Sequence, residues 1–236
     1  MVQLITLDVA GTTVNEGGAV YASLKAVIEE ALSVTISEEQ LRPALGANKR
    51  EAIAGFLTAF TGEADPEEVE RLYELFRLRL TRSYAENPPV ELPGVGEAID
   101  RMRAAGMIVA LTTGFSRSIS MMVLDSLGWS VGPSAEDRVD FLITSDDVDA
   151  GRPAPDMIRY AMRLAGVSDP AQVLAAGDTE RDLAAGMNAG AKYVVAVATG
   201  AQSGEHLSTF PHTHLCDVRD LPELLGVSER EKTAAP

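Results

Sequence analysis

Four polar segments of this chain each follow an apolar run, and their residue types suit the transfer of a phosphoryl group. The first run begins at Leu4 and rises to Asp8, after which the chain continues with Ala-Gly-Thr-Thr. The other three segments are Thr112-Thr113-Gly114, Gly151-Arg152-Pro153-Ala154-Pro155 and Gly177-Asp178-Thr179-Glu180-Arg181-Asp182. Because parallel strands bring their carboxyl ends to one edge of a sheet, we expect these segments to converge.

The carboxylates of this set predict covalent phosphoryl transfer beside a bound cation. Asp8 can attack phosphorus and form an acyl phosphate. Asp8 and Asp178 can share one hard cation, with the carbonyl of Ala10 and water completing an oxygen shell that suits Mg²⁺. The cation would lower the repulsion between Asp8 and an anionic phosphoryl group. Arg152 can balance developing negative charge and orient Asp8.

Hydroxyl and amide groups of the same segments can hold the phosphoryl oxygens. The Thr113 hydroxyl and the Gly114 amide are the first candidates. The predicted phosphate contacts are Ala10, Gly11, Thr12, Thr113, Gly114 and Arg152. Asp182, together with Thr179, is predicted to support this site through water or through the cation's other ligands.

Each segment also has a simpler interpretation, and Asp8 could be a residue of the turn that follows a strand. Asp182 lies four residues after Asp178 and could cap the first turn of a helix. Arg152, next to Pro153, could be an exposed loop cation, and Thr112-Thr113-Gly114 could be an ordinary turn after a strand. These interpretations are nearly independent of one another, so the occurrence of all four segments in this order argues for a site.

The composition argues against several classes of function. The chain has 236 residues and a formal net charge of -15, and so acidic a surface repels the phosphates of nucleic acids. The single cysteine, Cys216, cannot form a disulfide within the chain, which predicts a reducing cytoplasm. We expect no membrane span, because no apolar run approaches the ~20 residues that a span needs.

The spacing of apolar residues predicts an α/β core with a helical insertion. Helical periodicity covers nearly all of residues 16–88, directly after the first strand. From Leu92 onward short apolar runs alternate with helical segments, which predicts right-handed crossovers and a parallel sheet. The predicted units are a core of residues 1–15 and 89–226, a helical unit of residues 16–88, and a frayed tail of residues 227–236. The helix expected over residues 21–32 is apolar enough to pair with a second copy, which predicts a homodimer.

The order of the motifs resembles that of the haloacid dehalogenase-like hydrolase superfamily. The matching motifs are Asp-x-Ala-Gly-Thr-Thr, Thr-Thr-Gly, Gly-Arg-Pro-Ala-Pro and Gly-Asp-Thr-x-x-Asp. The resemblance covers nearly the whole chain. It implies a Rossmann-like core, a small helical cap domain over residues 16–88, Mg²⁺ as cofactor and an aspartyl-phosphate intermediate.

Within the superfamily the chain resembles the phosphonatase, or phosphonoacetaldehyde hydrolase, branch. Most phosphatases of the superfamily carry a second aspartate that protonates an alcohol leaving group, and this chain has Ala10 there, as phosphonatases do. The resemblance implies that Lys49, in Gly46-Ala47-Asn48-Lys49, forms an imine with the aldehyde of a small phosphonate. The imine would accept the electrons of the breaking C–P bond. Such a lysine must be partly neutral near pH 7, so its pKa must be lowered.

Departures from the phosphonatase pattern leave the substrate open. That branch has a methionine, a histidine and a cysteine where this chain has Leu45, Ala52 and no cysteine soon after the first motif. Lys49 could instead contact an anionic group of the substrate, or begin a helix as a solvated residue. The alternative functions are a phosphate monoesterase for a small metabolite such as phosphoglycolate, and an inactive binding protein on the same fold.

Overall fold

A computed structural model describes residues 1–227 of the chain. Its centre is a six-stranded sheet in the order β5-β4-β1-β6-β7-β8, in which every neighbouring pair is parallel. The six strands are β1 (Leu4–Asp8), β4 (Ile108–Thr112), β5 (Phe141–Ile143), β6 (Val173–Gly177), β7 (Tyr193–Ala196) and β8 (His214–Leu215). The predicted α/β fold with a parallel sheet is therefore confirmed.

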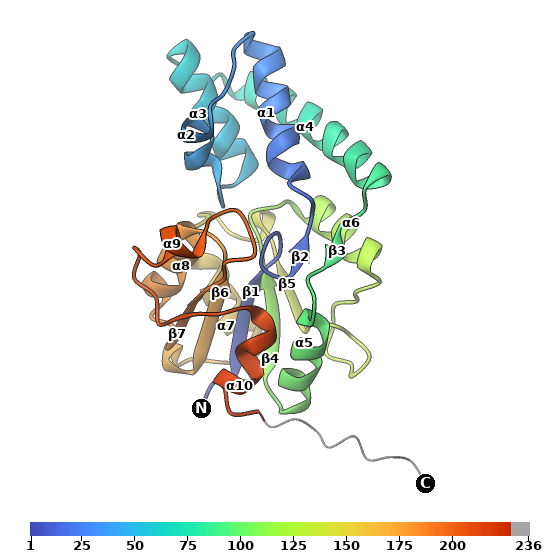
Figure 1. Cartoon of the computed structure of the whole chain (residues 1–236), viewed down its shortest axis with the longest axis vertical. Coiled ribbons are helices and arrows are strands. Elements are labelled where there is room, and N and C mark those ends of the chain that lie inside the picture. The colour runs from blue at the N-terminus through green and yellow to red at the C-terminus, as the bar shows by residue number, and fades with distance from the viewer. Residues whose placement is uncertain (228–236) are drawn as a thin grey trace.

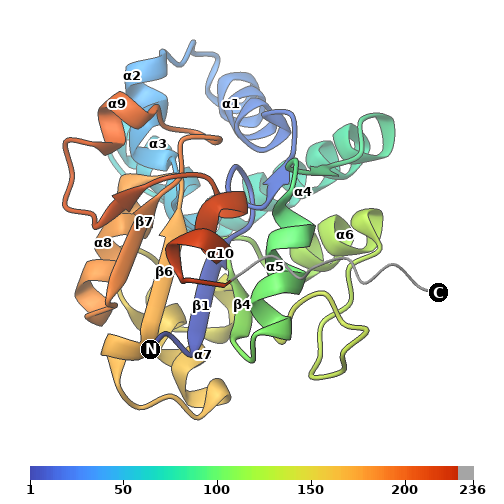
Figure 2. The same ribbon diagram turned by 60° about the horizontal axis from the view of Figure 1, so that its bottom comes forward.

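Helices cover both faces of the sheet, which explains why β1 is apolar along its length. All five residues of β1 are buried, and their side chains alternate between the two faces. Ile5 and Leu7 pack in the cluster that contains α5 and α6, whereas Leu4 packs in the cluster of α7 and α8. The core helices are α5 (Val95–Ala104), α6 (Arg117–Leu127), α7 (Asp156–Ala165), α8 (Glu180–Ala189), α9 (Gly204–Leu207) and α10 (Leu221–Leu224). Figure 2 shows α5 and α7 on opposite sides of the central strands.

A helical insertion lies beyond the end of the sheet opposite the N-terminus (Figure 1). It contains α1 (Ala19–Leu32), α2 (Glu38–Leu41), α3 (Lys49–Thr61) and α4 (Pro66–Glu86). Both links between insertion and core pass through one short antiparallel pair, β2 (Val14–Asn15) and β3 (Val90–Glu91). Two adjacent links of this kind would let the insertion move against the core as one body.

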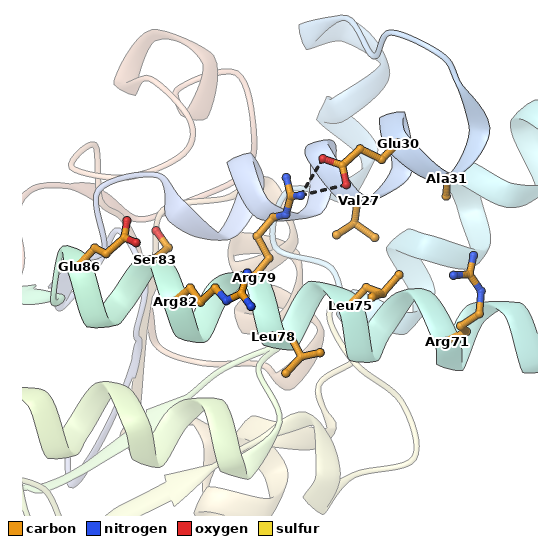
Figure 3. Close-up of a pocket in the computed structure, with 10 residues that line it drawn as sticks. All are labelled: Val27, Glu30, Ala31, Arg71, Leu75, Leu78, Arg79, Arg82, Ser83 and Glu86. Carbon is orange, nitrogen blue, oxygen red and sulfur yellow. Dashed lines mark hydrogen bonds and ion pairs between the residues drawn. The ribbon is translucent and has the colours of Figure 1, made fainter.

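The apolar face of α1 is used inside the insertion. Leu24, Val27 and Ile28 are buried there by the rest of the chain. The apolar side chains that stay exposed nearby are Leu75 and Leu78 of α4. They line a groove of about 660 Å³ between α1 and α4 (Figure 3).

Most predicted elements agree with the structure, and the differences concern short ones. The sequence Ser37-Glu38-Glu39-Gln40 predicts a capping box, and in the structure the Ser37 side chain accepts a hydrogen bond from the amide of Gln40. The spacing of apolar residues predicts a helix from Arg50 to Phe60, and the structure has α3 at Lys49–Thr61. The short elements β2, β3, β8, α9 and α10 were not expected. Within residues 1–227, no helix is both long enough and apolar enough to cross a bilayer. Residues 228–236 of the predicted frayed tail lie outside the described residues.

Candidate active site

Arg152 fixes the side chain of Asp8 at the tip of β1. The Nη1 atom of Arg152 donates a hydrogen bond of 2.6 Å to Oδ1 of Asp8. Its Nη2 atom donates to the carbonyl and hydroxyl oxygens of Thr112, at 2.8 and 2.9 Å, where β4 ends beside β1. Arg152 is only 6% exposed, so it is not the exposed loop cation of the simpler interpretation. The forked guanidinium therefore joins two strand ends and holds one carboxylate oxygen of Asp8.

Asp178 follows β6 and is held by a backbone turn on the other side of β1. Its Oδ2 accepts a hydrogen bond of 2.6 Å from the amide of Ala201, and its Oδ1 accepts one of 3.3 Å from the Thr12 hydroxyl. A Cβ atom on Gly200 would lie 2.0 Å from Oδ2, so a larger residue at that position would displace the carboxylate. Gly11 packs on the same carboxylate, and its amide donates to Val14 within the turn.

Asp182 both caps α8 and approaches Arg152. Its Oδ2 accepts hydrogen bonds from the amide and hydroxyl of Thr179, which forms the capping box expected from the simpler interpretation. Its Oδ1 lies 2.6 Å from Nη1 of Arg152 but has no partner of hydrogen-bond geometry among residues 1–227. The buried Oδ1 is therefore able to accept a further hydrogen bond from water.

The carboxylates of Asp8, Asp178 and Asp182 lie close together in this site, and such an arrangement suits a bound cation. Burial raises the pKa of Asp8 to about 6, and the charge of Asp182 adds to the rise while Arg152 opposes it. Burial and the charge of Asp8 raise the pKa of Asp178 well above its usual range. Because a divalent cation would relieve both effects, the donor set suits Mg²⁺. Among the described residues no three His, Cys, Asp or Glu side chains form a complete metal cluster, so backbone oxygen and water would have to complete the shell.

Thr113 and Gly114 line the cavity between Asp8 and the insertion. The Thr113 hydroxyl accepts a hydrogen bond of 3.1 Å from the amide of Phe115, which leaves its own proton free for an anionic oxygen. The amide of Gly114 has no hydrogen-bond acceptor within the described part of the chain. Gly11 and Thr12, in contrast, are not among the described residues that line this cavity.

Lys49 is buried between the core and the insertion. It is 3% exposed, so it is not a solvated residue at the start of a helix. Its Nζ atom donates a hydrogen bond of 2.8 Å to the carbonyl of Ala47. The same atom lies 5.1 Å from the ring centroid of Tyr21 and 5.9 Å from that of Phe115. The ammonium therefore has two aromatic faces and one carbonyl in place of water.

This environment changes the pKa of Lys49. Burial lowers the pKa to about 8, although the charges of Asp8 and Glu16 favour the ammonium and oppose that change. Glu16 precedes α1, and its carboxylate accepts a hydrogen bond of 2.8 Å from the amide of Val20 in the first turn of that helix. A pKa of about 8 leaves an appreciable fraction of neutral amine near pH 7.

The cavity that joins these groups is small. It measures about 30 Å³, which is about the share of liquid volume of one water molecule. Its walls from the insertion are Tyr21, Gly46, Ala47 and Lys49. Its walls from the core are Asp8, Ala10, Thr113, Gly114, Phe115, Arg152, Asp178, Thr179 and Asp182. A substrate larger than water therefore needs the insertion to move away from the core before it can enter.

Arg181 of α8 connects core and insertion at the rim. One guanidinium nitrogen donates a hydrogen bond of 2.8 Å to the carbonyl of Arg152 and lies 3.0 Å from a carboxylate oxygen of Glu51 in α3. The other nitrogen donates a hydrogen bond of 3.3 Å to the carbonyl of Pro43. The contacts of Arg181 with Glu51 and Pro43 thus exist only while the insertion is seated on the core.

The parallel sheet, the carboxylates at its strand ends and the helical insertion are typical of a hydrolase with a Rossmann-like core. Residues 2–190 match the family described as haloacid dehalogenase-like hydrolase, and the chain belongs to that family. A phosphonoacetaldehyde hydrolase from Bacteroides fragilis is 30% identical over 99% of this chain and 89% of its own length. The enzyme of that name from Nitratidesulfovibrio vulgaris is 31% identical over 86% of this chain and 74% of its own length.

Solved structures share the fold at lower identity. A phosphonoacetaldehyde hydrolase-like protein from Oleispira antarctica is 22% identical and superposes with a TM-score of 0.75, covering 95% of this chain and 91% of its own. CbbY from Rhodobacter sphaeroides, solved in complex with phosphate, is also 22% identical and has a TM-score of 0.76, with 96% and 99% coverage. These similarities support the same architecture for core and insertion.

Several residues of the cavity were not expected from the sequence. Thr112 lies in a predicted site segment but was given no role of its own, and its oxygens hold Arg152. Tyr21 falls on the same helical face as the buried Leu24, so its spacing indicates only a core residue. No motif or spacing in the sequence predicts that Phe115 lines the cavity. The contacts of these residues are made between distant parts of the chain, which local spacing does not reveal.

Proposed function

We propose that this hydrolase cleaves the C–P bond of a small phosphonate that carries an aldehyde, phosphonoacetaldehyde or a close relative, with Mg²⁺ as cofactor. The observation that carries this proposal is the buried Lys49, with a pKa lowered to about 8, on the same small cavity as Asp8 and Arg152. Relatives named phosphonoacetaldehyde hydrolase, at about 30% identity, support the same substrate class.

The carbon part of the reaction would take place on Lys49. The neutral amine condenses with the substrate aldehyde and releases water, which leaves an imine that is protonated on nitrogen. When the C–P bond breaks, its electron pair moves onto carbon and is shared with this nitrogen, so no free carbanion forms. The resulting enamine takes up a proton on carbon, and hydrolysis of the imine releases the aldehyde and restores Lys49. Ala10 has no proton to give, and this route does not need one from it.

The phosphoryl part would take place on Asp8. The carboxylate oxygen attacks phosphorus as the P–C bond breaks and forms an aspartyl phosphate, which water then hydrolyses. Arg152 holds Asp8 in position, and Thr113 and Gly114 offer a hydroxyl and a free amide to the phosphoryl oxygens. These donors lie ready in a small cavity, where hydrogen bonds to anionic oxygens are stronger than in water.

The proposed Mg²⁺ ligands are Asp8, Asp178 and the carbonyl of Ala10, with Asp182 and Thr179 supporting them. Asp182 would act through its buried Oδ1, which can accept a hydrogen bond from a ligand water. When bound, the cation reduces the repulsion between the carboxylates and an anionic substrate.

We propose that the helical insertion acts as a cap. The 30 Å³ cavity excludes bulk water in the closed form, and the paired links β2 and β3 are suited to a hinge. Closure would bring Lys49, carried by the insertion, to Asp8, carried by the core. The pairing of two copies and a cytoplasmic location stay predictions.

A substrate panel tests the proposal. Phosphate release is measured with Mg²⁺ for phosphonoacetaldehyde, phosphoglycolate and p-nitrophenyl phosphate, with wild type and with Lys49→Arg. We expect phosphonoacetaldehyde to be the best substrate and Lys49→Arg to lose that activity by at least about 10³-fold. Faster turnover of phosphate esters, with little effect of Lys49→Arg, would instead establish a phosphate monoesterase.

A further inference from the structure

Tyr21 places a phenol group on the cavity that the steps above do not use. The residue lies in the first turns of α1 and lines the cavity together with Asp8 and Lys49. It is partly exposed because it also borders a larger outer pocket of about 190 Å³. Its oxygen accepts a hydrogen bond of 2.9 Å from the amide of Gly46. The phenol proton therefore points elsewhere, and it has no acceptor among residues 1–227.

The same loop holds both Tyr21 and Lys49. Tyr21 binds the amide of Gly46, and Lys49 binds the carbonyl of the next residue, Ala47. The Lys49 nitrogen lies 5.1 Å from the centroid of the Tyr21 ring. The loop thus fixes the amine and the phenol relative to one another. A carbonyl group that reaches Lys49 enters the space that the Tyr21 side chain borders.

Other hydroxyl groups on the cavity are less suited to give up a proton to that carbonyl. The Thr179 hydroxyl already donates its proton to Asp182. The Thr113 hydroxyl belongs to the strand-end segment proposed for the phosphoryl oxygens, and an aliphatic hydroxyl is a far weaker acid than a phenol. Burial raises the pKa of Tyr21 above its usual range, so the phenol keeps its proton until a partner needs it.

We propose that Tyr21 is the acid that protonates the substrate carbonyl oxygen when Lys49 forms its imine, a role that rests on the proposed function. As the N–C bond forms, the oxygen takes the Tyr21 proton, and Tyr21 takes one back from the nitrogen. The C–O bond then breaks, the oxygen takes the Tyr21 proton again and leaves as water, and the C=N bond forms. The proton that Lys49 released on becoming neutral restores Tyr21, so the step needs no outside reactant.

The experiment follows the rate at which the imine forms. Enzyme and phosphonoacetaldehyde are mixed, quenched with borohydride at set times, and the adduct at Lys49 is quantified by mass spectrometry. The variants are Tyr21→Phe, a site-specific 3-fluorotyrosine at position 21, and Tyr84→Phe as the matched control. Tyr84 is a buried tyrosine of the same insertion, and its hydroxyl has no hydrogen-bond partner among residues 1–227.

We expect Tyr21→Phe to slow adduct formation by about 100-fold or more, as removal of an acid catalyst does, while Tyr84→Phe matches wild type. The fluorinated phenol keeps the hydrogen bond to Gly46 but is a stronger acid than tyrosine. The rate of adduct formation in this variant should therefore differ from the wild-type rate. Equal rates for Tyr21→Phe and Tyr84→Phe would overturn the proposal. A slow Tyr21→Phe with a fluorotyrosine rate equal to wild type would also overturn it, because Tyr21 would then only position the loop. If the wild-type enzyme formed no adduct, the proposed function itself would be contradicted, and the role of Tyr21 as an acid would be contradicted with it.

Discussion

Arg152 donates a hydrogen bond of 2.6 Å to Asp8, and the two residues are 144 positions apart in the chain. Both side chains are almost fully buried, and the second arm of the guanidinium is held by Thr112. Arg152 orients the carboxylate that we propose as the nucleophile, and it opposes the rise in the pKa of Asp8 that burial causes. This single contact links the two segments on which the proposed phosphoryl transfer depends.

The first prediction concerns that contact. Arg152→Gln should lower kcat/KM for phosphate release by about 10²- to 10³-fold, the usual loss when one donor to a developing anion is removed. Arg152→Lys should recover little of the activity, because an ammonium cannot bind Asp8 and Thr112 as a fork. The exposed Arg159 of α7 supplies the control, since Arg159→Gln should leave kcat/KM unchanged. Comparable activity of Arg152→Gln and Arg159→Gln would contradict the role.

The second prediction is a difference between two pH profiles. Asp8 must be ionised to attack, so activity toward any phosphate or phosphonate should rise as the pH passes about 6, or lower once Mg²⁺ is bound. Lys49 must be neutral to form an imine, so phosphonoacetaldehyde cleavage should rise further up to about pH 8 and then level off. Hydrolysis of p-nitrophenyl phosphate should lack this second rise. Identical profiles for the two substrates would argue against the imine.

The third prediction concerns stability. The pKa of Lys49 is about 8 in the folded chain against 10.5 in the unfolded chain, so below pH 8 the folded state carries a buried ammonium at a cost. Lys49→Met should therefore raise the free energy of unfolding at pH 7 by about 2 kcal/mol. The gain should shrink as the pH rises from 8 toward 10.5, because the wild type is then neutral when folded. Urea unfolding at pH 7 and pH 10 measures both values, and a destabilised Lys49→Met at pH 7 would contradict the prediction.

The fourth prediction concerns the cation. Chelation should abolish activity, and Mg²⁺ should raise the Tm of wild type, because the ion relieves repulsion between Asp8 and Asp178. Asp178→Asn should raise the Tm in chelator at pH 7 and lose its response to Mg²⁺. An asparagine can still accept from the amide of Ala201 and donate to the Thr12 hydroxyl. The gain should shrink as the pH falls toward the unfolded-state pKa of 3.8 and vanish below it, where the wild-type carboxyl is protonated in both the folded and the unfolded state. An unchanged Tm response in Asp178→Asn would show that the ion binds elsewhere.

The fifth prediction concerns closure of the insertion. Glu51→Gln removes the charge that faces Arg181 across the rim, and surface pairs of this kind contribute roughly 0.2 to 1 kcal/mol. We expect kcat/KM to fall about two- to fivefold. Glu70→Gln is the matched control, because Glu70 pairs with Arg50 inside the insertion and so does not depend on closure. In double-mutant cycles with Arg181→Gln, we expect Glu51→Gln to be coupled to Arg181→Gln and Glu70→Gln not to be. Equal effects of Glu51→Gln and Glu70→Gln on kcat/KM would contradict a role of Glu51 in closure.

The sequence predicted the parts of the molecule that local patterns encode. The apolar run before Asp8 and the alternation of strands and helices after Leu92 led to the parallel sheet. The capping boxes at Ser37 and Thr179 are short-range hydrogen bonds, so their residue spacing alone was informative. Helix α3 begins at Lys49, one residue before the predicted Arg50, because Asn48 caps it.

The sequence could not predict contacts that form only after the chain has folded. Strands β2 and β3 have two residues each, which is too short for a periodic pattern, and their pairing joins positions 14 and 91. The apolar face of residues 21–32 fits pairing with another copy equally well as packing inside the insertion, and the structure uses it for packing. The place of Tyr21 next to Lys49 depends on the fold of the loop at Gly46, which spacing does not describe.

The most direct test of the account is the site of the borohydride adduct in the wild-type enzyme. Enzyme incubated with phosphonoacetaldehyde and borohydride is digested and mapped by mass spectrometry, with substrate omitted as control. The account predicts one substrate-dependent adduct, on the peptide that contains Lys49, and loss of activity in proportion to it. Full cleavage of phosphonoacetaldehyde with no adduct at Lys49, or with the adduct on another lysine, would contradict it.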